Sequence, residues 1–283
     1  MASLTDTARM IRTIVAERRG ARVRYAYLGD HTAVVGTRAN LFLLVDTRDR
    51  GITPHIALTG RWEVDVERVL VRLLKPGLRI VEVGANVGYH TLTMARAVGP
   101  TGHIDAFEPN PRLYDLLTDS LSLNGCRNIV TAHRNAVLDR AGPVEFQFHP
   151  RFSGGGSVVV PAHLDPNSVR IEVAGVRLDD VLGSGPPIDL LRMDAEGSEP
   201  LALRGAEQLL QRSPAMLIMM EFWPNMMRMR TDIPEFTAWL GTFGFKAWRV
   251  GRWGTLAAVA MADLPGLPQC DIVLSRDVPP GAR

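Results

Sequence analysis

Acidic side chains stand in or directly after several of the apolar runs in this sequence. The end of a buried strand is expected at each of these places. A carboxylate there can accept hydrogen bonds from a ligand or take up a proton from it. The side chains in question are Glu82, Glu108, Asp194, Glu196 and Glu221.

The turn at 84–88 follows the first of these strands and carries glycine at both ends. A dinucleotide fingerprint, G-x-G-x-x-G, would also need glycine at Asn86 and Tyr89, so a pyrophosphate cradle of that kind is not expected. Glu82 also disfavours a pyrophosphate ligand, because a carboxylate in the strand end repels phosphate. The same carboxylate suits a ligand with an ammonium or sulfonium group. The plain alternative is an ordinary strand–helix connection whose glycines serve the turn.

Glu108 lies 24 residues after Gly84 and ends the next strand. A carboxylate there can accept hydrogen bonds from both hydroxyls of a ribose. Asn135 and Ala136 follow the strand after that, where a small amide and a backbone N–H can recognise an adenine edge. An Asx-type turn explains these two residues equally well, and the sequence does not decide between the two interpretations.

The elements that position these residues alternate between strand and helix from residue 79 onward. Helices are expected near 63–74, 89–98, 111–123, 201–211 and 233–242. Strands are expected at 80–83, 103–107, 129–133, 188–193, 215–220, 245–250 and 270–275, with an extra antiparallel strand at 144–148. This alternation predicts a mostly parallel sheet covered by helices on both faces, with ligands beyond the carboxyl ends of its strands.

Two further segments are expected outside this sheet. Residues 21–75 are expected to form an extension with small strands, preceded by a short amphipathic helix within residues 1–20. The glycine-rich segment 149–169 is predicted to be a surface loop, long enough to act as a lid or a substrate loop.

The composition is that of a globular protein. The 283 residues carry 32 basic and 30 acidic side chains, a formal charge of +2 that is too balanced for nucleic-acid binding by electrostatics alone. The two cysteines, Cys126 and Cys270, are expected to be buried thiols rather than a disulfide or a metal site. Neither a signal peptide nor an apolar run long enough to span a membrane is expected, so the predicted location is the cytoplasm.

The turn 84–88, Glu108 and Asn135-Ala136 together resemble class I S-adenosylmethionine-dependent methyltransferases. The segment 188–199 narrows the resemblance to the FkbM-type family, because it carries the signature D-x-E-G-x-E after the fourth strand. The turn G-A-N-x-G-Y and the element Gly60-Arg61-Trp62-Glu63 are similar to that family as well. The resemblance covers roughly residues 56–225, with Arg192 in place of the usual lysine and no counterpart for 149–169.

This resemblance implies a doubly wound, Rossmann-like α/β fold with a mostly parallel seven-stranded sheet. It divides the chain into an N-terminal extension, 1–75, and a methyltransferase domain, 76–283. It implies O-methylation of a hydroxyl on a small molecule, such as a natural product or a sugar, with S-adenosylmethionine as cofactor. The residues expected to bind this cofactor are Glu63, Glu82, Gly84, Ala85, Asn86, Gly88, Tyr89, Glu108, Pro109, Asn135, Ala136 and Asp194.

Methyl transfer to an alcohol needs a group that takes the hydroxyl proton, and the sequence offers four candidates. Asp194 is the leading candidate for the general base, with Glu196 orienting it or holding the donor. His90 at the start of a helix and Glu221 after the fifth strand compete with it. Asp194, Glu196 and Glu221 can also bind Mg²⁺, although a metal-free site is the favoured expectation.

Some of these residues have simpler explanations. Ser198 is expected to cap the helix that follows the signature, with Glu199 in its first turn beside the helix dipole. Trp223 can stack on a ring or a sugar beside Glu221. Met226 and Met227 suit an apolar pocket or a homodimer face, and the sequence does not separate the two.

Two other functions share this fold class. A nucleic-acid methyltransferase usually needs a basic surface, and base methylation at nitrogen often uses an Asn-Pro-Pro-aromatic element where this chain has 194–197. A non-catalytic nucleotide-binding protein is the second alternative, since the fold does not fix the function. The expected partner is therefore a small hydroxyl acceptor, with neither nucleic acid nor membrane as a partner.

Overall fold

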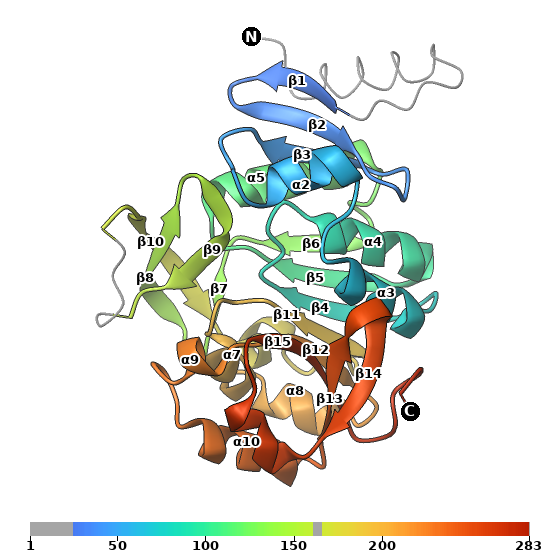
Figure 1. Ribbon diagram of the computed structural model, residues 1–283, viewed down its shortest axis with the longest axis vertical. Helices are drawn as coiled ribbons and strands as arrows, with labels where there is room; N and C mark the ends of the chain where they lie inside the picture. The colour runs from blue at the N-terminus through green and yellow to red at the C-terminus, as the bar shows by residue number, and fades with distance from the viewer. Residues whose placement is uncertain (1–24, 161–165, 283) are drawn as a thin grey trace.

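The computed structural model describes residues 25–160 and 166–282 of the chain (Figure 1). The helix expected within residues 1–20 lies outside this described part. The largest element is an eight-stranded sheet with the order β14-β13-β15-β12-β11-β4-β5-β6. Its strands are β4 (Arg79–Val83), β5 (His103–Phe107), β6 (Val130–His133), β11 (Leu190–Met193), β12 (Leu217–Phe222), β13 (Lys246–Gly251), β14 (Thr255–Val259) and β15 (Cys270–Ser275).

Five neighbouring strands of this sheet, from β12 to β6, are parallel to one another. At the other edge, β15 pairs antiparallel with β12, β13 with β15, and β14 with β13. The chain runs outward from β4 through β5 to β6 and later continues on the other side of β4 with β11 and β12. The strand order therefore reverses between β4 and β11. In such sheets this reversal opens a crevice at the carboxyl ends of the strands, where ligands bind.

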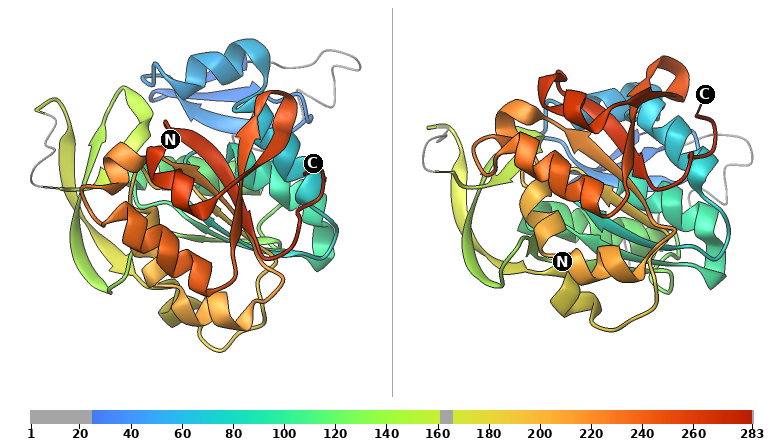
Figure 2. Two further views of the ribbon diagram at one scale, coloured as in Figure 1. Left: turned by 60° about the horizontal axis from the view of Figure 1, so that its bottom comes forward. Right: turned by 90° about the horizontal axis from the view of Figure 1, so that it is seen from below.

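Helices cover both faces of the large sheet (Figure 2). One apolar core joins one face to α3 (Val64–Leu73), α4 (Tyr89–Val98) and α5 (Pro111–Leu123). The other face packs against α7 (Glu199–Arg204), α8 (Glu207–Arg212) and α10 (Ile233–Thr242). Ile80 of β4 belongs to the first core and Val81 to the second, as the alternation of side chains along a strand requires. The expected doubly wound α/β fold is confirmed.

Two smaller sheets flank this body. The segment before α3 forms an antiparallel sheet of β1 (Tyr25–Gly29), β2 (Thr32–Gly36) and β3 (Phe42–Asp46), followed by α2 (Ile52–Thr59). The sheet is attached to α5, whose Ser120 and Asn124 side chains accept hydrogen bonds from the backbone of β3. The second sheet has the order β7-β10-β8-β9, with β7 (Ala136–Val137), β8 (Gly142–His149), β9 (Phe152–Val158) and β10 (Val169–Val176).

The structure departs from the sequence-based expectations at several places, and three of them have a clear physical reason. The large sheet has an eighth strand, because the chain turns at Gly254 and pairs β14 with β13. The helix expected over 201–211 is two helices, because the carboxylate of Asp179 accepts hydrogen bonds from the backbone of Gln208 and Leu209 and so starts a second helix. The loop expected over 149–169 contains β9, which pairs antiparallel with β8 despite its three glycines.

The extra strand expected at 144–148 is confirmed as part of β8. Both cysteines are free thiols, Cys126 buried and Cys270 half-buried. Among the described residues, no helix combines the length and the apolar character that crossing a membrane requires.

Candidate active site

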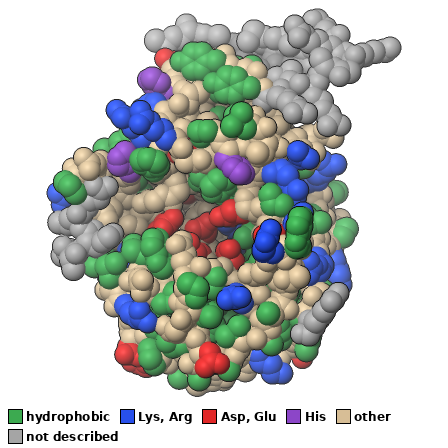
Figure 3. Space-filling model, in the orientation of Figure 1, with side chains coloured by type: hydrophobic (Ala, Val, Ile, Leu, Met, Phe, Trp, Pro, Cys, Tyr) green, Lys and Arg blue, Asp and Glu red, His purple; other side chains and the backbone are tan. Residues whose placement is uncertain are grey.

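A cavity opens at the point where the strand order reverses. The loops after β4, β5, β11 and β12 form its walls, and β9, α2 and the turn before α3 contribute to them from outside the large sheet. The space between its walls amounts to about 1060 Å³, the open mouth included. Figure 3 shows acidic side chains gathered in the hollow on this face of the molecule.

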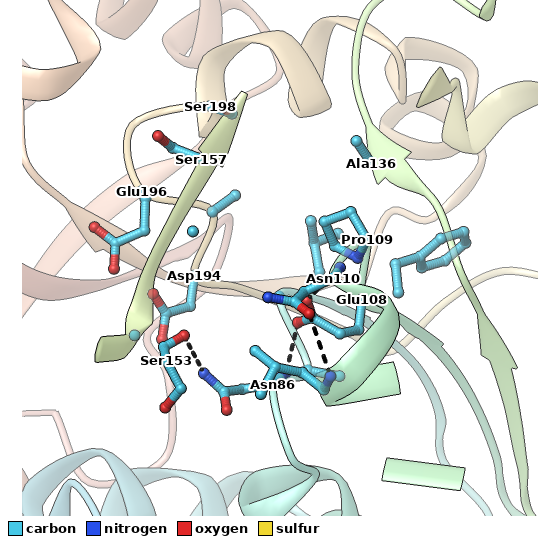
Figure 4. A pocket seen from close by; sticks show the side chains of 18 of the residues that line it. Asn86, Glu108, Pro109, Asn110, Ala136, Ser153, Ser157, Asp194, Glu196 and Ser198 are labelled. Carbon is cyan, nitrogen blue, oxygen red and sulfur yellow. Dashed lines mark hydrogen bonds between the residues drawn. The ribbon is translucent and has the colours of Figure 1, made fainter. Parts of the chain in front are cut away.

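The turn 84–88 forms the floor of this cavity and depends on its glycines for its shape. Gly84 has φ +81°, and a Cβ atom there would lie 1.8 Å from the carbonyl oxygen of Asp194. Gly84 is thus required by the close approach of the chain after β11, in addition to any ligand contact. Asn86, also with positive φ, donates its backbone N–H to Glu108 Oε2 at 2.8 Å and its side-chain amide to the Ser153 carbonyl at 2.9 Å (Figure 4).

Glu108 is held in a fixed orientation at the cavity wall. Its Oε2 accepts the N–H of Asn86, and its Oε1 accepts the N–H of Asn110 at 2.9 Å. Burial raises the pKa of Glu108 to about 7, although these two N–H groups favour its charged form. Each oxygen keeps a second lone pair, so the carboxylate can still accept both hydroxyls of a ribose.

Most of the other residues predicted for the adenosyl side also reach the cavity, but Gly88 does not line it and packs against Leu117 instead. Asn135 and Ala136 line it, with Pro109 nearby (Figure 4). The side-chain amide of Asn135 donates to the Ala174 carbonyl at 3.2 Å, which favours a structural role for the amide itself.

Arg192 lies at the centre of an acidic cluster, and sequence reasoning missed this role. Its guanidinium contacts Asp194 Oδ2 at 3.1 Å, Glu82 Oε1 at 3.2 Å and Glu63 Oε2 at 3.5 Å. Burial alone would lower the pKa of Arg192, but these acids outweigh burial and raise it. The guanidinium is therefore charged, and it offsets part of the negative charge of the site.

Glu82 does not line the cavity, contrary to its predicted contact with the ligand. Its side chain is fully buried, accepts a hydrogen bond from Thr91 Oγ1 and pairs with Arg192. Burial raises the pKa of Glu82 to about 7. Its position within β4, one residue before the strand end, directs it to Arg192 on neighbouring β11, with which it is in register. Glu82 thus positions Arg192.

Asp194, Glu196 and Glu221 come together from the ends of β11 and β12, as the sequence predicted. One oxygen of each lies within 4.8 Å of the others. Burial raises the pKa of all three carboxyl groups, and the neighbouring carboxylates raise it further. The pKa rises to about 9 for Glu196 and to about 7 for Glu221. For Asp194, the charge of Arg192 offsets part of the rise. Their oxygens fit a hard cation such as Mg²⁺, but Arg192 already supplies a positive charge beside Asp194.

His90 is buried and contacts Glu63 Oε2 through Nε2 at 2.9 Å. Burial, followed by the charge of Arg192, lowers the pKa of His90, so the imidazole is neutral near pH 7. A hydrogen atom on Nε2 then faces Glu63, and only Nδ1 can accept a proton. That nitrogen is buried and has no hydrogen-bond partner in the described part of the chain. His90 is thus better placed to orient Glu63 than to act as the base.

Ser198 and Glu199 lie at the start of α7 as predicted, but the predicted capping role of the Ser198 side chain is wrong. Ser198 makes no side-chain capping bond, and its Oγ is buried without a partner among the described residues. Glu199 is fully buried, and its Oε1 accepts the backbone N–H of Ala195 at 2.7 Å, which holds the turn after β11 in shape. Burial raises the pKa of Glu199 to about 8, so it does not act as a solvated charge at the helix dipole.

Three cavity residues adopt backbone conformations that are unusual for side chains with a Cβ. Glu63, Asn86 and Glu196 have φ values of +44°, +52° and +51°. Such residues persist only where the surrounding structure holds them, and they concentrate at functional sites. This independent feature marks the same cavity as the functional site.

Several cavity residues escaped the sequence analysis. Ile52 and Trp62 come from the segment before α3, and they line the cavity together with the predicted Glu63 and Tyr89. The strand β9 contributes Ser153, Gly154, Gly156, Ser157 and Val158. In the sequence, the only indication that these β9 residues line a site is the glycine run itself, which is equally typical of a loop. Trp223 is absent from the lining, whose aromatic rings are those of Trp62, Tyr89, Phe107 and Phe146.

The chain matches the profile of a known protein family. Residues 82–247 match the profile of the FkbM methyltransferase domain, which is more than half of the chain. The chain belongs to the FkbM methyltransferase family. The matched region begins at Glu82 in β4 and ends at Ala247 in β13, so it contains most of the cavity but not Trp62 or Glu63.

Two curated relatives and one solved structure illustrate the range of similarity. Methyltransferase sdnD of Sordaria araneosa is 32% identical over 158 residues, 46% of this chain and 60% of sdnD. Hexuronic acid methyltransferase AglP of Haloferax volcanii is 26% identical over 153 residues, 53% of this chain and 59% of AglP. This chain thus spans about 60% of the length of these curated relatives.

The solved structure is that of O-methyltransferase TomG from Streptomyces achromogenes, in complex with S-adenosylmethionine. It is 16% identical and matches with a TM-score of 0.43 over 75% of this chain and 78% of TomG. At that TM-score the likeness carries no argument about this chain.

Proposed function

We propose that this FkbM-family chain is an S-adenosylmethionine-dependent O-methyltransferase that acts on a hydroxyl of a small molecule, a natural product or a sugar. The observation that carries the proposal is the cavity at the strand reversal. There, Glu108 is held by two backbone N–H groups beside the 84–88 turn, and Asp194 lies at the end of the neighbouring strand β11. A donor site and a proton acceptor therefore share one cavity.

The donor side is built for an adenosyl group with a cationic tail. Glu108 would accept the ribose hydroxyls, and Pro109 and Ala136 offer an apolar surface for the base. Glu63 and Asp194 would attract the positive charge of the donor. When bound, S-adenosylmethionine supplies a methyl group on a sulfonium that loses its charge during transfer.

Asp194 would take the proton of the acceptor hydroxyl. A carboxylate oxygen of Asp194 would hold this proton once the acceptor oxygen has received the methyl group. Burial raises the pKa of Asp194 above its ordinary value, which makes it a better proton acceptor near neutral pH. Arg192 holds the carboxylate in place through Oδ2 at 3.1 Å, so Oδ1 is the oxygen left to face the acceptor.

The relatives support methyl transfer and leave the acceptor open. The name of AglP assigns it to hexuronic acid, and that of sdnD assigns it to no substrate. A nucleic-acid substrate is disfavoured, because the single arginine that lines the described cavity is already paired with acids and cannot hold a phosphate.

Paired measurements on Asp194→Asn test this proposal. Calorimetry with S-adenosylhomocysteine reports donor-side binding, and release of that product from S-adenosylmethionine reports turnover against a panel of hydroxylated small molecules. The variant should lose about 10²–10⁴-fold in turnover while binding the product almost as the wild type does. Unchanged turnover would remove Asp194 from the catalytic residues, and absence of product binding to the wild type would refute the proposed function.

A further inference from the structure

We propose that the acceptor subsite lies between the glycine run of β9 and the carboxylates of Glu196 and Glu221. We further propose that it takes a polyhydroxylated molecule without a negative charge. This inference rests on the proposed function and names the class of acceptor for the same cavity.

The two sides of the cavity differ in what they offer. Figure 4 shows Glu108, Pro109 and Asn110 together on one side and Asp194, Glu196 and Ser153 on the other. The first group fits the adenosyl half of the donor. The second group, at the end of β11 and on β9, is therefore what an acceptor meets.

The acidic side chains of the lining disfavour an anionic acceptor. Five carboxylates line the cavity against one guanidinium, that of Arg192, within the part of the chain that the structure describes. Arg192 already pairs with Glu63, Glu82 and Asp194. A carboxylate or phosphate on the acceptor would thus face Glu196 and Glu221, and Arg192 is not free to bind it. Hydroxyl groups suit these side chains, because they can donate to a carboxylate and accept from a protonated one.

A second polar group points to the same kind of ligand. Ser198 lines the cavity with only 3% of its surface exposed, and its Oγ has no hydrogen-bond partner among the described residues. Buried hydroxyls are rarely left without a partner unless a ligand or a water supplies one. A hydroxyl of the acceptor would satisfy this group.

The glycines of β9 leave room for the acceptor. Gly154 lines the cavity, and a Cβ there would meet only the Ile52 side chain, at 3.5 Å. The pairing of β9 with β8 shifts register between Gln147 and His149, opposite this run. Glycine at such an irregularity in a strand is typical of a close approach by a ligand. Gly155 differs, because it does not line the cavity and a Cβ there would meet nothing within 4 Å.

Two sugars that differ in one group test the charge requirement. Methyl glucoside and methyl glucuronide share a ring, and only the second carries a carboxylate. Ligand-observed NMR titrations with each sugar, in the presence of S-adenosylhomocysteine, would compare their affinities. We expect the neutral sugar to bind at least about tenfold more tightly. Equal or tighter binding of the glucuronide, or binding of neither sugar to a protein that binds S-adenosylhomocysteine, would overturn the inference.

A matched pair of variants tests the place of the subsite. Gly154→Val fills the space beside Ile52 and should weaken glucoside binding at least about tenfold, whereas Gly155→Val should leave it unchanged. Both variants should bind S-adenosylhomocysteine as the wild type does, which shows that they are folded. Equal effects of the two substitutions on glucoside binding would refute the placement at β9. If the wild type fails to bind S-adenosylhomocysteine, the proposed function itself fails, and this inference falls with it.

Discussion

Replacement of Glu196 by glutamine should stabilise the protein without its donor, and by more as the pH rises. Burial, followed by the charge of Glu221, raises the pKa of Glu196 from 4.5 to about 9. Between these two values the folded protein binds more protons at Glu196 than the unfolded chain does. The free energy of unfolding of the wild type therefore falls as the pH rises through this window. Glutamine keeps the shape of the side chain and cannot ionise, so the variant escapes this loss.

The size of the effect follows from the shift. At pH 7 the ordinary value of 4.5 lies 2.5 pH units below the solution pH, and each unit is worth about 1.36 kcal/mol. The upper limit is thus about 3 kcal/mol. Relaxation of the neighbouring acids and entry of water reduce it, so we expect a gain of about 1–3 kcal/mol at pH 7. At pH 5 the gain should almost vanish.

Urea unfolding at pH 5, 6, 7 and 8 measures this gain directly. Glu172→Gln is the matched control, because Glu172 lies exposed on β10 and should show no comparable pH-dependent gain. The reasoning is refuted if Glu196→Gln is less stable than the wild type at pH 8. In that case the charged form of Glu196 would have a favourable partner in the folded protein.

Four further predictions concern the same site. Gly84→Ala should unfold the protein or destabilise it by several kcal/mol, because a Cβ there would overlap the Asp194 carbonyl; a wild-type melting temperature would contradict this. Glu108→Gln should weaken binding of S-adenosylhomocysteine by about 10–100-fold in calorimetry, and an unaltered affinity would show that Glu108 does not bind the ribose. Arg192→Met should cost about 3–5 kcal/mol in urea unfolding, because it leaves Glu82 buried without its ion-pair partner; a change below about 1 kcal/mol would contradict the central role of Arg192. Methyl transfer should also survive EDTA, and loss of activity that Mg²⁺ restores would show that the three carboxylates hold a metal.

Much of the fold could be predicted from local patterns. The strands and helices of the alternating region have regular apolar spacing, and Pro111 and Gly99 punctuate them, so their types and approximate bounds follow from the sequence. The strand β9 could not be predicted, because its glycines signal a loop unless the pairing with β8 is known. Likewise, the start of α8 depends on Asp179, which is distant in the sequence.

The candidate site was predictable where a residue stands at a strand end. Glu108, Asp194, Glu196 and Glu221 all meet in the cavity, because the carboxyl ends of parallel strands share one edge. The roles of Glu82 and Arg192 were not predictable, because one residue of register decides whether a side chain faces the cavity or a neighbouring strand. The contribution of Trp62 and β9 depends on how separate segments pack, which spacing alone does not encode.

A crystal structure with S-adenosylhomocysteine bound would test the central claim most directly. The account predicts that the 84–88 turn lies against the adenosyl group and that both ribose hydroxyls lie within about 3.2 Å of the Glu108 carboxylate. The sulfur should then point toward Asp194. A bound product in another part of the molecule, or a ribose without contact to Glu108, would contradict the account.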